Sequence, residues 1–375
     1  MNKNKGLGKH LGPVLFAAVL ALFFWAGSAA AQTLKDLPPP PPPPPTPTPT
    51  PRPTPKDEDV DVVRVTSNLV MVPVSVVDQS GQPVLGLQIA DFRLDEQGRE
   101  QKISELGNPE QVPLDIVLLF DISSSVSQKG FFAFQQTAAA SFLRQVMKPI
   151  DRAAVFTIAA EPRLVQPLAS AEVAAAKLRT IPAATSPVPT AFYDTVNAAA
   201  IYLAQKSAEG HRRVIVVISD GDDNFSSLVK EMTSAEARAS ARGEVTSLAA
   251  KSSLDARRQQ AVREVQRAVQ QADVAFYSIN PGGPSVRLNL ISTRAQNAMQ
   301  LIAESTGGSA FVPDGEVGLE RVFSEVAAEL RGQYLVQYYS DSQASTGQFR
   351  TIRVAVPTRS NVRIRARQGY YPKQK

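Results

Sequence analysis

Two patterns of hydrophobic and polar positions divide the chain after residue 60. In the middle, near-continuous apolar runs such as residues 116–120 and 214–218 alternate with segments whose apolar positions recur at helical spacing. Continuous runs are typical of parallel strands that are covered by helices on both faces. Towards both ends of this region, apolar and polar residues alternate, which is typical of half-buried strands. The pattern therefore predicts an α/β domain with β-rich flanks.

The middle region, residues 113–332, is predicted to be a doubly wound α/β domain with a mostly parallel sheet. The predicted strands cover residues 115–120, 153–159, 213–219, 274–280 and 309–312. The predicted helices cover residues 131–147, 171–180, 191–206, 255–272, 294–305 and 316–331. Residues 223–254 exceed an ordinary loop between a strand and a helix, and we interpret them as an insertion with a helix at 231–249.

The flanks, residues 60–112 and 333–375, are both β-rich. We expect their strands to pair in one smaller β-rich domain that the α/β domain interrupts. In the last predicted strand, Arg363, Arg365 and Arg367 alternate with apolar residues and so share one face. We favour a solvated face whose charges discourage edge pairing, and the alternative is a strip that binds anionic polymers of the cell envelope.

The N-terminal part has the features of an export signal and a spacer. In residues 1–31, three lysines precede an apolar segment, and an Ala-x-Ala cleavage site ends at Ala31. The apolar segment is shorter than the ~20 residues that span a bilayer, so we expect cleavage. The protein would then be periplasmic, associated with the cell envelope or secreted, with membrane contact only if the signal segment stays uncleaved. Residues 32–59 form a proline-rich linker, expected to be a semi-rigid spacer, with a docking site for a proline-recognition module as the alternative.

Composition excludes several kinds of chemistry. The chain has no cysteine and two histidines, His10 and His211, the first of them in the signal segment. Disulfides, thiolate zinc sites, cysteine nucleophiles and multi-histidine zinc sites are therefore excluded. The lysines of the signal segment account for three units of the net charge of +5. The remaining balance is too weak to indicate a nucleic-acid partner.

The apolar run at residues 116–120 ends in Asp121, which is followed by Ser123 and Ser125. A turn that leaves a strand at this spacing can direct a carboxylate and two hydroxyl oxygens at one point. Oxygen ligands suit a hard divalent cation such as Mg²⁺. The alternative is that a serine in this segment caps the next helix.

Two other loops are predicted to reach the same edge of the sheet. The predicted strand at residues 213–219 ends at Asp220, and Thr190 precedes a predicted helix. Because parallel strands present their carboxyl ends at one edge, we expect these side chains near Asp121. Taken singly, Thr190 is also compatible with a helix cap, and Asp220 with an ordinary turn.

Taken together, segments 120–125, 190–194 and 218–224 resemble the three parts of the metal-ion-dependent adhesion site of von Willebrand factor A domains. The resemblance covers roughly residues 114–331 and implies a Rossmann-like fold. The flanks, including residues 68–74 and 365–371, are similar to an exported bacterial family of A-domain-related proteins.

The resemblance also implies a set of ligands and a role. The metal ligands would be Asp121, Ser123, Ser125, Thr190 and Asp220, with Thr190 or Asp220 or both acting through water. Mg²⁺ is expected, with Mn²⁺ or Ca²⁺ as alternatives, and the carboxylate of a protein partner would take the remaining coordination position. The expected function is an exported adhesion or protein-binding module and not an enzyme. One alternative is an envelope assembly factor that binds through its insertion and β-rich domain. The other is a Mg²⁺-dependent hydrolase, for which the pattern offers no base beside the site.

Overall fold

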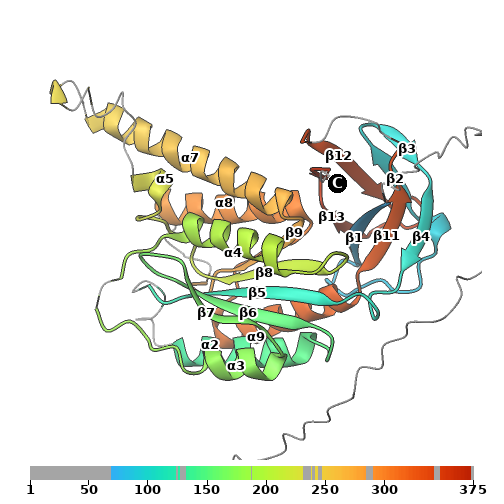
Figure 1. The fold of residues 1–375 in the computed structure, drawn as a ribbon, viewed down its shortest axis with the longest axis horizontal. Helices are drawn as coiled ribbons and strands as arrows, with labels where there is room; N and C mark the ends of the chain where they lie inside the picture. Colours follow the sequence, from blue (N-terminus) through green and yellow to red (C-terminus); the bar gives the residue numbers. More distant parts are fainter. Residues whose placement is uncertain are drawn as a thin grey trace, which may run out of the picture. The chain divides into compact units, whose positions relative to one another are not determined.

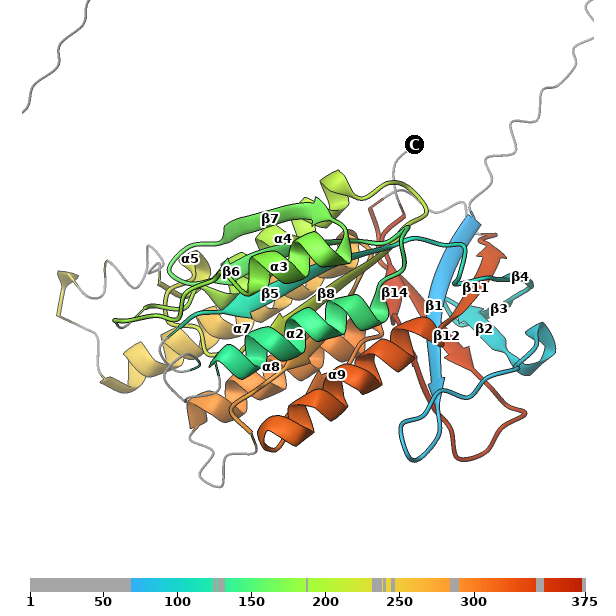
Figure 2. The ribbon, with the colours of Figure 1, turned by 90° about the horizontal axis from the view of Figure 1, so that it is seen from below.

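The computed structural model describes residues 69–123, 126, 132–186, 188–230, 238, 241–243, 247–283, 290–341 and 347–372. The predicted signal segment, the proline-rich linker and most of the predicted helix at 231–249 lie outside these ranges. The described part contains an α/β lobe, residues 114–331, and a β lobe, built from residues 69–107 and 334–372 (Figures 1 and 2).

The central sheet of the α/β lobe has the strand order β10-β9-β8-β5-β6-β7. Its strands are β5 (Leu114–Asp121), β6 (Arg152–Ile158), β7 (Arg163–Ala169), β8 (Arg212–Ile218), β9 (Val274–Ile279) and β10 (Ala310–Phe311). All of them pair in parallel except β7, which is antiparallel to β6, so the predicted mostly parallel sheet is confirmed. The edge strand β7 was not predicted, because it contains Pro167 and lacks a continuous apolar run.

Helices cover both faces of this sheet (Figure 1). One face carries α2 (Phe132–Val146), α3 (Ala171–Leu178) and α9 (Gly315–Arg331). The other carries α4 (Phe192–Lys206), α7 (Ser247–Gln271) and α8 (Leu290–Thr306), with the short α5 (Ser227–Lys230) before α7. None of the helices in the described ranges has both the length and the apolar character that a membrane span requires.

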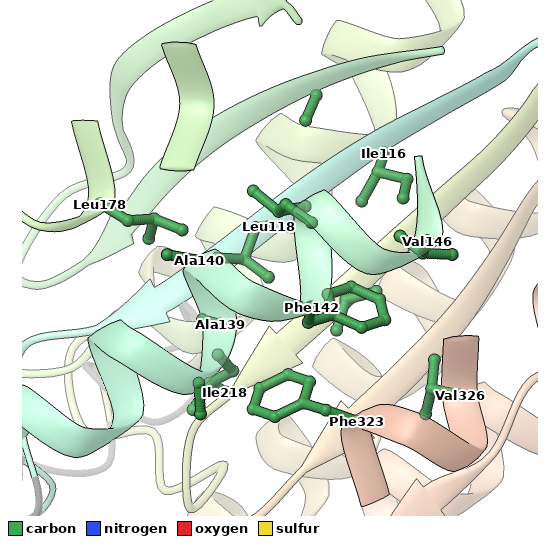
Figure 3. Close-up of a cluster of buried hydrophobic side chains, with 14 of the residues drawn as sticks. Ile116, Leu118, Ala139, Ala140, Phe142, Val146, Leu178, Ile218, Phe323 and Val326 are labelled. Carbon is green, nitrogen blue, oxygen red and sulfur yellow. The ribbon is translucent and has the colours of Figure 1, made fainter. Parts of the chain in front are cut away.

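The strand β5 shows why the central strands are apolar throughout. Successive side chains of a strand point to opposite faces, and both faces are covered here. Ile116 and Leu118 belong to the cluster under α2, α3 and α9, which Figure 3 shows. Val117 and Leu119 belong to the cluster under α4, α7 and α8. All four side chains are 0% exposed. Packing on both faces therefore holds β5 in place, including its carboxyl end.

The β lobe consists of two sheets with the strand orders β13-β1-β11-β4 and β14-β12-β2-β3. Its elements are β1 (Leu69–Val77), η1 (Ile89–Asp91), β2 (Arg93–Glu96), β3 (Arg99–Gln101), β4 (Ile103–Gly107), β11 (Tyr334–Tyr339), β12 (Arg350–Ala355), β13 (Arg363–Ala366) and β14 (Gly369–Tyr370). β1 pairs with β11 and β13, and β2 pairs with β12. The predicted pairing of the N-terminal with the C-terminal flank is therefore confirmed. Alternate side chains such as Val72, Leu94 and Val336 form a common core.

Of the three alternating arginines in and just after β13, two form ion pairs with the α/β lobe. Arg365 lies 2.5 Å from a carboxylate oxygen of Glu329 on α9, and Arg367 pairs with Asp273, which precedes β9. The expectation that Arg363, Arg365 and Arg367 share a solvated face, or form one anion-binding strip, is therefore wrong. That face of β13 lies against the α/β lobe, and of these arginines Arg363 alone is exposed.

Candidate metal centre

The carboxyl ends of β5 and β8 lie side by side in the middle of the α/β sheet. Phe120 pairs with Ile218, which makes neighbours of Asp121, the last residue of β5, and Ser219, the first residue after β8. β5 has β6 on its other side, so the order of strands reverses between β5 and β8. In open α/β sheets, ligands bind at such a reversal, because the loops that follow the strands separate there.

The carboxylate of Asp121 is held by hydrogen bonds on both of its oxygens. The backbone N–H of Ser123 donates to Oδ1 at 2.7 Å, and the Ser219 hydroxyl donates to Oδ2 at 2.5 Å. The Ser219 hydroxyl in turn accepts the N–H of Gly221 at 3.0 Å. Ser219 was not predicted as a site residue. Its position at the end of a strand, one residue before Asp220, could have indicated a role in the site. Ser219 connects two of the predicted site residues, Asp121 and Asp220.

The buried negative charge of Asp121 would be stabilised by a bound cation. Its side chain is 0% exposed, and Ser123 is 1% exposed. The pKa of Asp121 is raised to about 6, mainly by burial and to a smaller extent by the negative charge of Asp220, against the lowering effect of the hydrogen bonds from Ser219 and Ser123. Asp220 directly follows Ser219, whose hydroxyl binds Asp121, so both carboxylates belong to the same edge of the sheet. A positive charge between them would relieve both the burial and the repulsion.

The loop that carries Thr190 is bound to the loop after β8. The N–H of Thr190 donates to the side-chain oxygen of Asn224 at 2.9 Å, and the Thr190 carbonyl accepts the N–H groups of Asn224 and Phe225, each at 3.1 Å. The next N–H, of Ala191, donates to the carbonyl of Ala159 beyond the end of β6 at 2.8 Å. Thr190 is therefore tied to two strand ends, and it is 4% exposed.

The start of α4 shows that Thr190 is not a helix cap. The N-cap position of α4 is Ala191, which makes no side-chain capping bond. Asp223 instead accepts the N–H of Tyr193 at 2.8 Å and the Ser226 hydroxyl at 2.5 Å, while the Ser226 hydroxyl accepts the N–H of Asp194 at 3.0 Å. Asp223 therefore orients the loop after β8 and caps α4 from another segment. Sequence reasoning missed this cap because it crosses between loops.

Four of the five predicted ligands lie in the described part of the chain. Asp121 and Ser123 are joined directly, Thr190 is fixed to the loop that follows Asp220, and Asp220 acts on Asp121 through its charge. Ser125 lies outside the described residues, as does most of the segment in which a serine would cap the next helix. The four predicted ligands that are described therefore come from three loops at one edge of the sheet.

The residues present fit a hard divalent cation. They offer carboxylate and hydroxyl oxygens, which Mg²⁺, Mn²⁺ and Ca²⁺ accept. The Asp121 carboxylate accepts hydrogen bonds from Ser123 and Ser219, and the lone pairs of a carboxylate can also serve a metal or its bound water. Within the described ranges, no group of three or more histidine, cysteine, aspartate or glutamate residues is placed to hold a metal. A metal here would therefore depend on hydroxyl oxygens as well as on the two carboxylates.

Gly221 shapes the loop after β8 and leaves room beside it. Its φ is +73°, and a Cβ at this position would lie 2.7 Å from the terminal methyl carbon of Met299 on α8. A cavity of about 320 Å³ adjoins this loop, between Asp222 and the helices α7 and α8, with Arg258 and Val262 in its lining. The edge of the sheet thus has space for a side chain from another molecule.

His211, the one histidine outside the predicted signal segment, lies at the other end of the sheet. Its Nδ1 is 3.0 Å from the carboxylate of Asp115, near the start of β5, whereas Asp121 ends that strand. At the rise of an extended strand, this separation is roughly 20 Å. His211 therefore cannot act on a substrate held at Asp121.

The comparisons with known proteins concern the α/β lobe. The family model described as "von Willebrand factor type A domain" matches residues 115–314. No curated protein matches the chain.

Several solved structures match this chain over part of its length. An aerotolerance-related membrane protein of Bacteroides fragilis shares 18% identity over 57% of this chain and 98% of its own, with a TM-score of 0.36. The von Willebrand domain of the type V pili tip protein Mfa5 of Porphyromonas gingivalis shares 13% identity over 58% of this chain and 94% of its own, with a TM-score of 0.42. Proximal thread matrix protein 1 of the mussel byssus, with a zinc-occupied MIDAS motif, shares 14% identity over 62% of this chain, has a TM-score of 0.41, and is matched over 48% of its own length.

The family model covers the whole sheet of the α/β lobe, including the strands β5 and β8 and the loops that bring Asp121, Thr190 and Asp220 to one edge. This chain belongs to the von Willebrand factor type A domain family.

Proposed function

We propose that this chain is an exported binding protein that holds an acidic side chain of a partner protein through Mg²⁺. The metal would be bound by Asp121, Ser123, Ser125, Thr190 and Asp220. Membership of the von Willebrand factor type A family supports a protein-binding or adhesion module in general. The choice of metal, the export and the acidic partner are our proposal.

One observation carries this proposal: the buried Asp121 is linked by Ser219 to the loop that bears Asp220, and Thr190 is fixed to the same loop. A bound cation would supply positive charge and a coordination position for a partner's oxygen. Two carboxylates among five ligands leave such a cation with net attraction for an anion. Ser219 and the N–H of Ser123 keep the Asp121 carboxylate in place without neutralising its charge.

We propose binding and not turnover at this site. A hydrolase would need a general base within hydrogen-bond reach of the attacking water. The side chains around Asp121 in the described ranges are hydroxyls and carboxylates, and His211 lies at the opposite end of β5. Of the carboxylates in the loop after β8, Asp220 is assigned to the metal and Asp223 to the cap of α4.

Calorimetric titration with Mg²⁺ tests the metal site. The isosteric variant Asp121→Asn removes the charge and keeps the shape, and we expect it to weaken Mg²⁺ binding more than about tenfold, which corresponds to ~1.4 kcal/mol. Asp341→Asn, an exposed aspartate in the β lobe, is the matched control and should bind Mg²⁺ like the wild type. Equal Mg²⁺ affinity of Asp121→Asn and the wild type would refute the metal site.

A second experiment tests the role of the metal in binding. Partners from the native envelope are crosslinked to the protein and captured with Mg²⁺ or with EDTA. We expect the specific partner to be lost with EDTA and with Asp121→Asn, and retained with Asp341→Asn. If the same partner is captured equally under all these conditions, binding does not pass through the metal, and the proposed function is wrong.

A further inference from the structure

A second candidate binding site lies away from the metal centre, where the β lobe meets the C-terminal end of α8. It is a groove of about 590 Å³, lined by both lobes. Its walls are the end of α8 with the turn that follows it, residues 352–354 of β12, and the whole of β13. In Figure 1 these elements face one another on the side of the molecule where the C-terminus is marked.

The groove runs between two strand edges. β13 pairs with β1 on one side and ends its sheet on the other, as the order β13-β1-β11-β4 shows. β12 pairs with β14 at Arg350 and Thr351 alone, so from Arg353 onward that side of β12 has no partner strand among the described residues. Unpaired strand edges present N–H and C=O groups that can pair with another chain.

The exposed charged residues that line the groove are Arg353, Arg363 and Glu304, so arginine charge is in excess there. Of its arginines, Arg365 and Arg367 are committed to Glu329 and Asp273. Arg353 and Arg363, on the two facing strands, are exposed, and neither forms an ion pair with a side chain in the described ranges. Glu304, in the α8 wall, accepts a hydrogen bond from Gln300 at 2.7 Å.

We propose that this groove binds an extended acidic segment of a partner protein, which adds a strand to the edge of β13 or β12 and places carboxylates against Arg353 and Arg363. Main-chain hydrogen bonds would give affinity, and the arginines would select acidic side chains. Partly buried apolar residues of the groove lining, Val354 and Ile364, would contact the alternate side chains of the strand.

The composition of the groove favours a peptide over an acidic glycan. Carbohydrate and nucleic-acid sites commonly offer aromatic rings for stacking, but the described residues that line the groove include no aromatic side chain. Two unpaired strand edges can form main-chain hydrogen bonds with a ligand that has a peptide backbone. A carboxylate binds the planar guanidinium group through paired hydrogen bonds, and both exposed arginines are available for this.

Fluorescence anisotropy with the purified protein tests this proposal. The probe is a labelled peptide of alternating glutamate and valine, about eight residues long, which is within the range of natural strands. We expect saturable binding that weakens with added salt and is unchanged by EDTA. The variant Arg353→Gln/Arg363→Gln should weaken binding roughly tenfold, since two partly exposed charge pairs are lost. Independence from EDTA separates this site from the metal centre.

Three controls make the outcome decisive. The variant Arg179→Gln/Arg321→Gln removes two exposed arginines of the α/β lobe that lie outside the groove, and it should bind the peptide like the wild type. A lysine–valine peptide should not bind, and a glutamate–proline peptide, which lacks half of the backbone donors, should bind much more weakly. Polygalacturonate is the glycan control.

Any of three binding results overturns the proposal, and so does a fourth result, which concerns EDTA. The three binding results are the absence of saturable binding of the glutamate–valine peptide to the wild type, equal loss of binding in the two double variants, and binding of polygalacturonate in place of the peptide. The last result would assign the groove to acidic glycans. Loss of peptide binding with EDTA would move the interaction to the metal centre and would also overturn the proposal.

Discussion

Glu329 of α9 and Arg365 of β13 form an ion pair of 2.5 Å across the boundary between the two lobes. Glu329 is 2% exposed, and its other carboxylate oxygen accepts a hydrogen bond from the Tyr277 hydroxyl at 3.1 Å. Burial raises the pKa of Glu329, and the positive charge of Arg365 opposes that shift. The β lobe thus supplies the charge that stabilises a carboxylate buried on the α/β lobe.

Replacing Arg365 should therefore destabilise both lobes together. Arg365→Met leaves the Glu329 carboxylate buried without a cation, and we expect a loss of about 3 kcal/mol in the free energy of unfolding. Arg365→Met/Glu329→Gln should lose less than Arg365→Met, because it removes the uncompensated charge. Urea unfolding monitored by circular dichroism measures these changes.

The matched control for this experiment is Arg363→Gln, which alters the exposed arginine of the same strand. It should change the free energy of unfolding by less than about 0.5 kcal/mol. Equal effects of Arg365→Met and Arg363→Gln would contradict the role assigned to the ion pair.

The Ser219 hydroxyl should matter for metal affinity although it is not a predicted ligand. Ser219→Ala removes the hydrogen bond to Asp121 and leaves the N–H of Gly221 without its acceptor. Because partners that orient a ligand typically contribute 10–100-fold to metal affinity, we expect Mg²⁺ binding to weaken by about tenfold. Ser278→Ala is the control, since the Ser278 hydroxyl on β9 is buried without a hydrogen-bond partner in the described part of the chain. Calorimetry should show no change for this control, and a similar loss in both variants would mean that Ser219 acts through general packing.

Gly221 should tolerate no side chain. In Gly221→Ala the new Cβ meets the side chain of Met299, which is 1% exposed and cannot move aside freely. We expect a loss of stability of about 2 kcal/mol from the positive φ and the crowding, together with weaker Mg²⁺ binding. Gly210→Ala is the control, because Gly210 has a φ of +80° and open space around it. Thermal unfolding should place Gly210→Ala between the wild type and Gly221→Ala, and equal shifts would show that crowding by Met299 is absent.

Asp115 should make the protein sensitive to acid. Its carboxylate is 0% exposed and accepts hydrogen bonds of 2.9 and 2.8 Å from Arg152. Burial by itself would raise the pKa of Asp115, but the hydrogen bonds and charge of Arg152, with the bond from His211, bring it below its usual value. A carboxyl with a lowered pKa in the folded state stabilises the protein above its unfolded pKa, which is ~3.9, and this contribution is lost as pH falls through the lower folded value.

The urea midpoint of the wild type should thus fall steeply below about pH 4. Asp115→Asn should be less stable at neutral pH and should lose less on acidification, because its amide does not titrate. Asp341→Asn, exposed in the β lobe, should follow the wild-type curve. If Asp115→Asn shows the same acid dependence as the wild type, other carboxylates are responsible.

Much of the fold could be predicted because the hydrophobic pattern reports burial directly. The apolar run around Leu118 predicted a strand that is covered on both faces, and β5 is such a strand. The exposed edge strand β7 gave no comparable signal. Alternation in β13 correctly separated its two faces, but a sequence does not say whether a charged face meets water or another lobe. Arg365 was assigned to solvent for this reason, although it meets Glu329.

The site could be predicted at the level of loops and less well at the level of contacts. Asp121, Thr190 and Asp220 follow elements of a parallel sheet, and topology places such residues at one edge. The contacts that fix them, from Ser219 to Asp121 and from Asp223 to the start of α4, join segments far apart in the sequence. Local spacing carries no information about these pairs.

The strand β1 has a consequence for the order in which the protein folds. Its partners β11 and β13 lie near the far end of the chain, with Leu69 opposite Tyr339 and Val77 opposite Arg363. During synthesis from the amino end, the α/β lobe receives all its strands before the partners of β1 exist. Until then the valine-rich β1 is an unpaired strand, and unpaired strands are prone to aggregation. The β lobe is therefore completed last, and a chaperone would protect this chain most effectively by covering β1 until its C-terminal strands arrive.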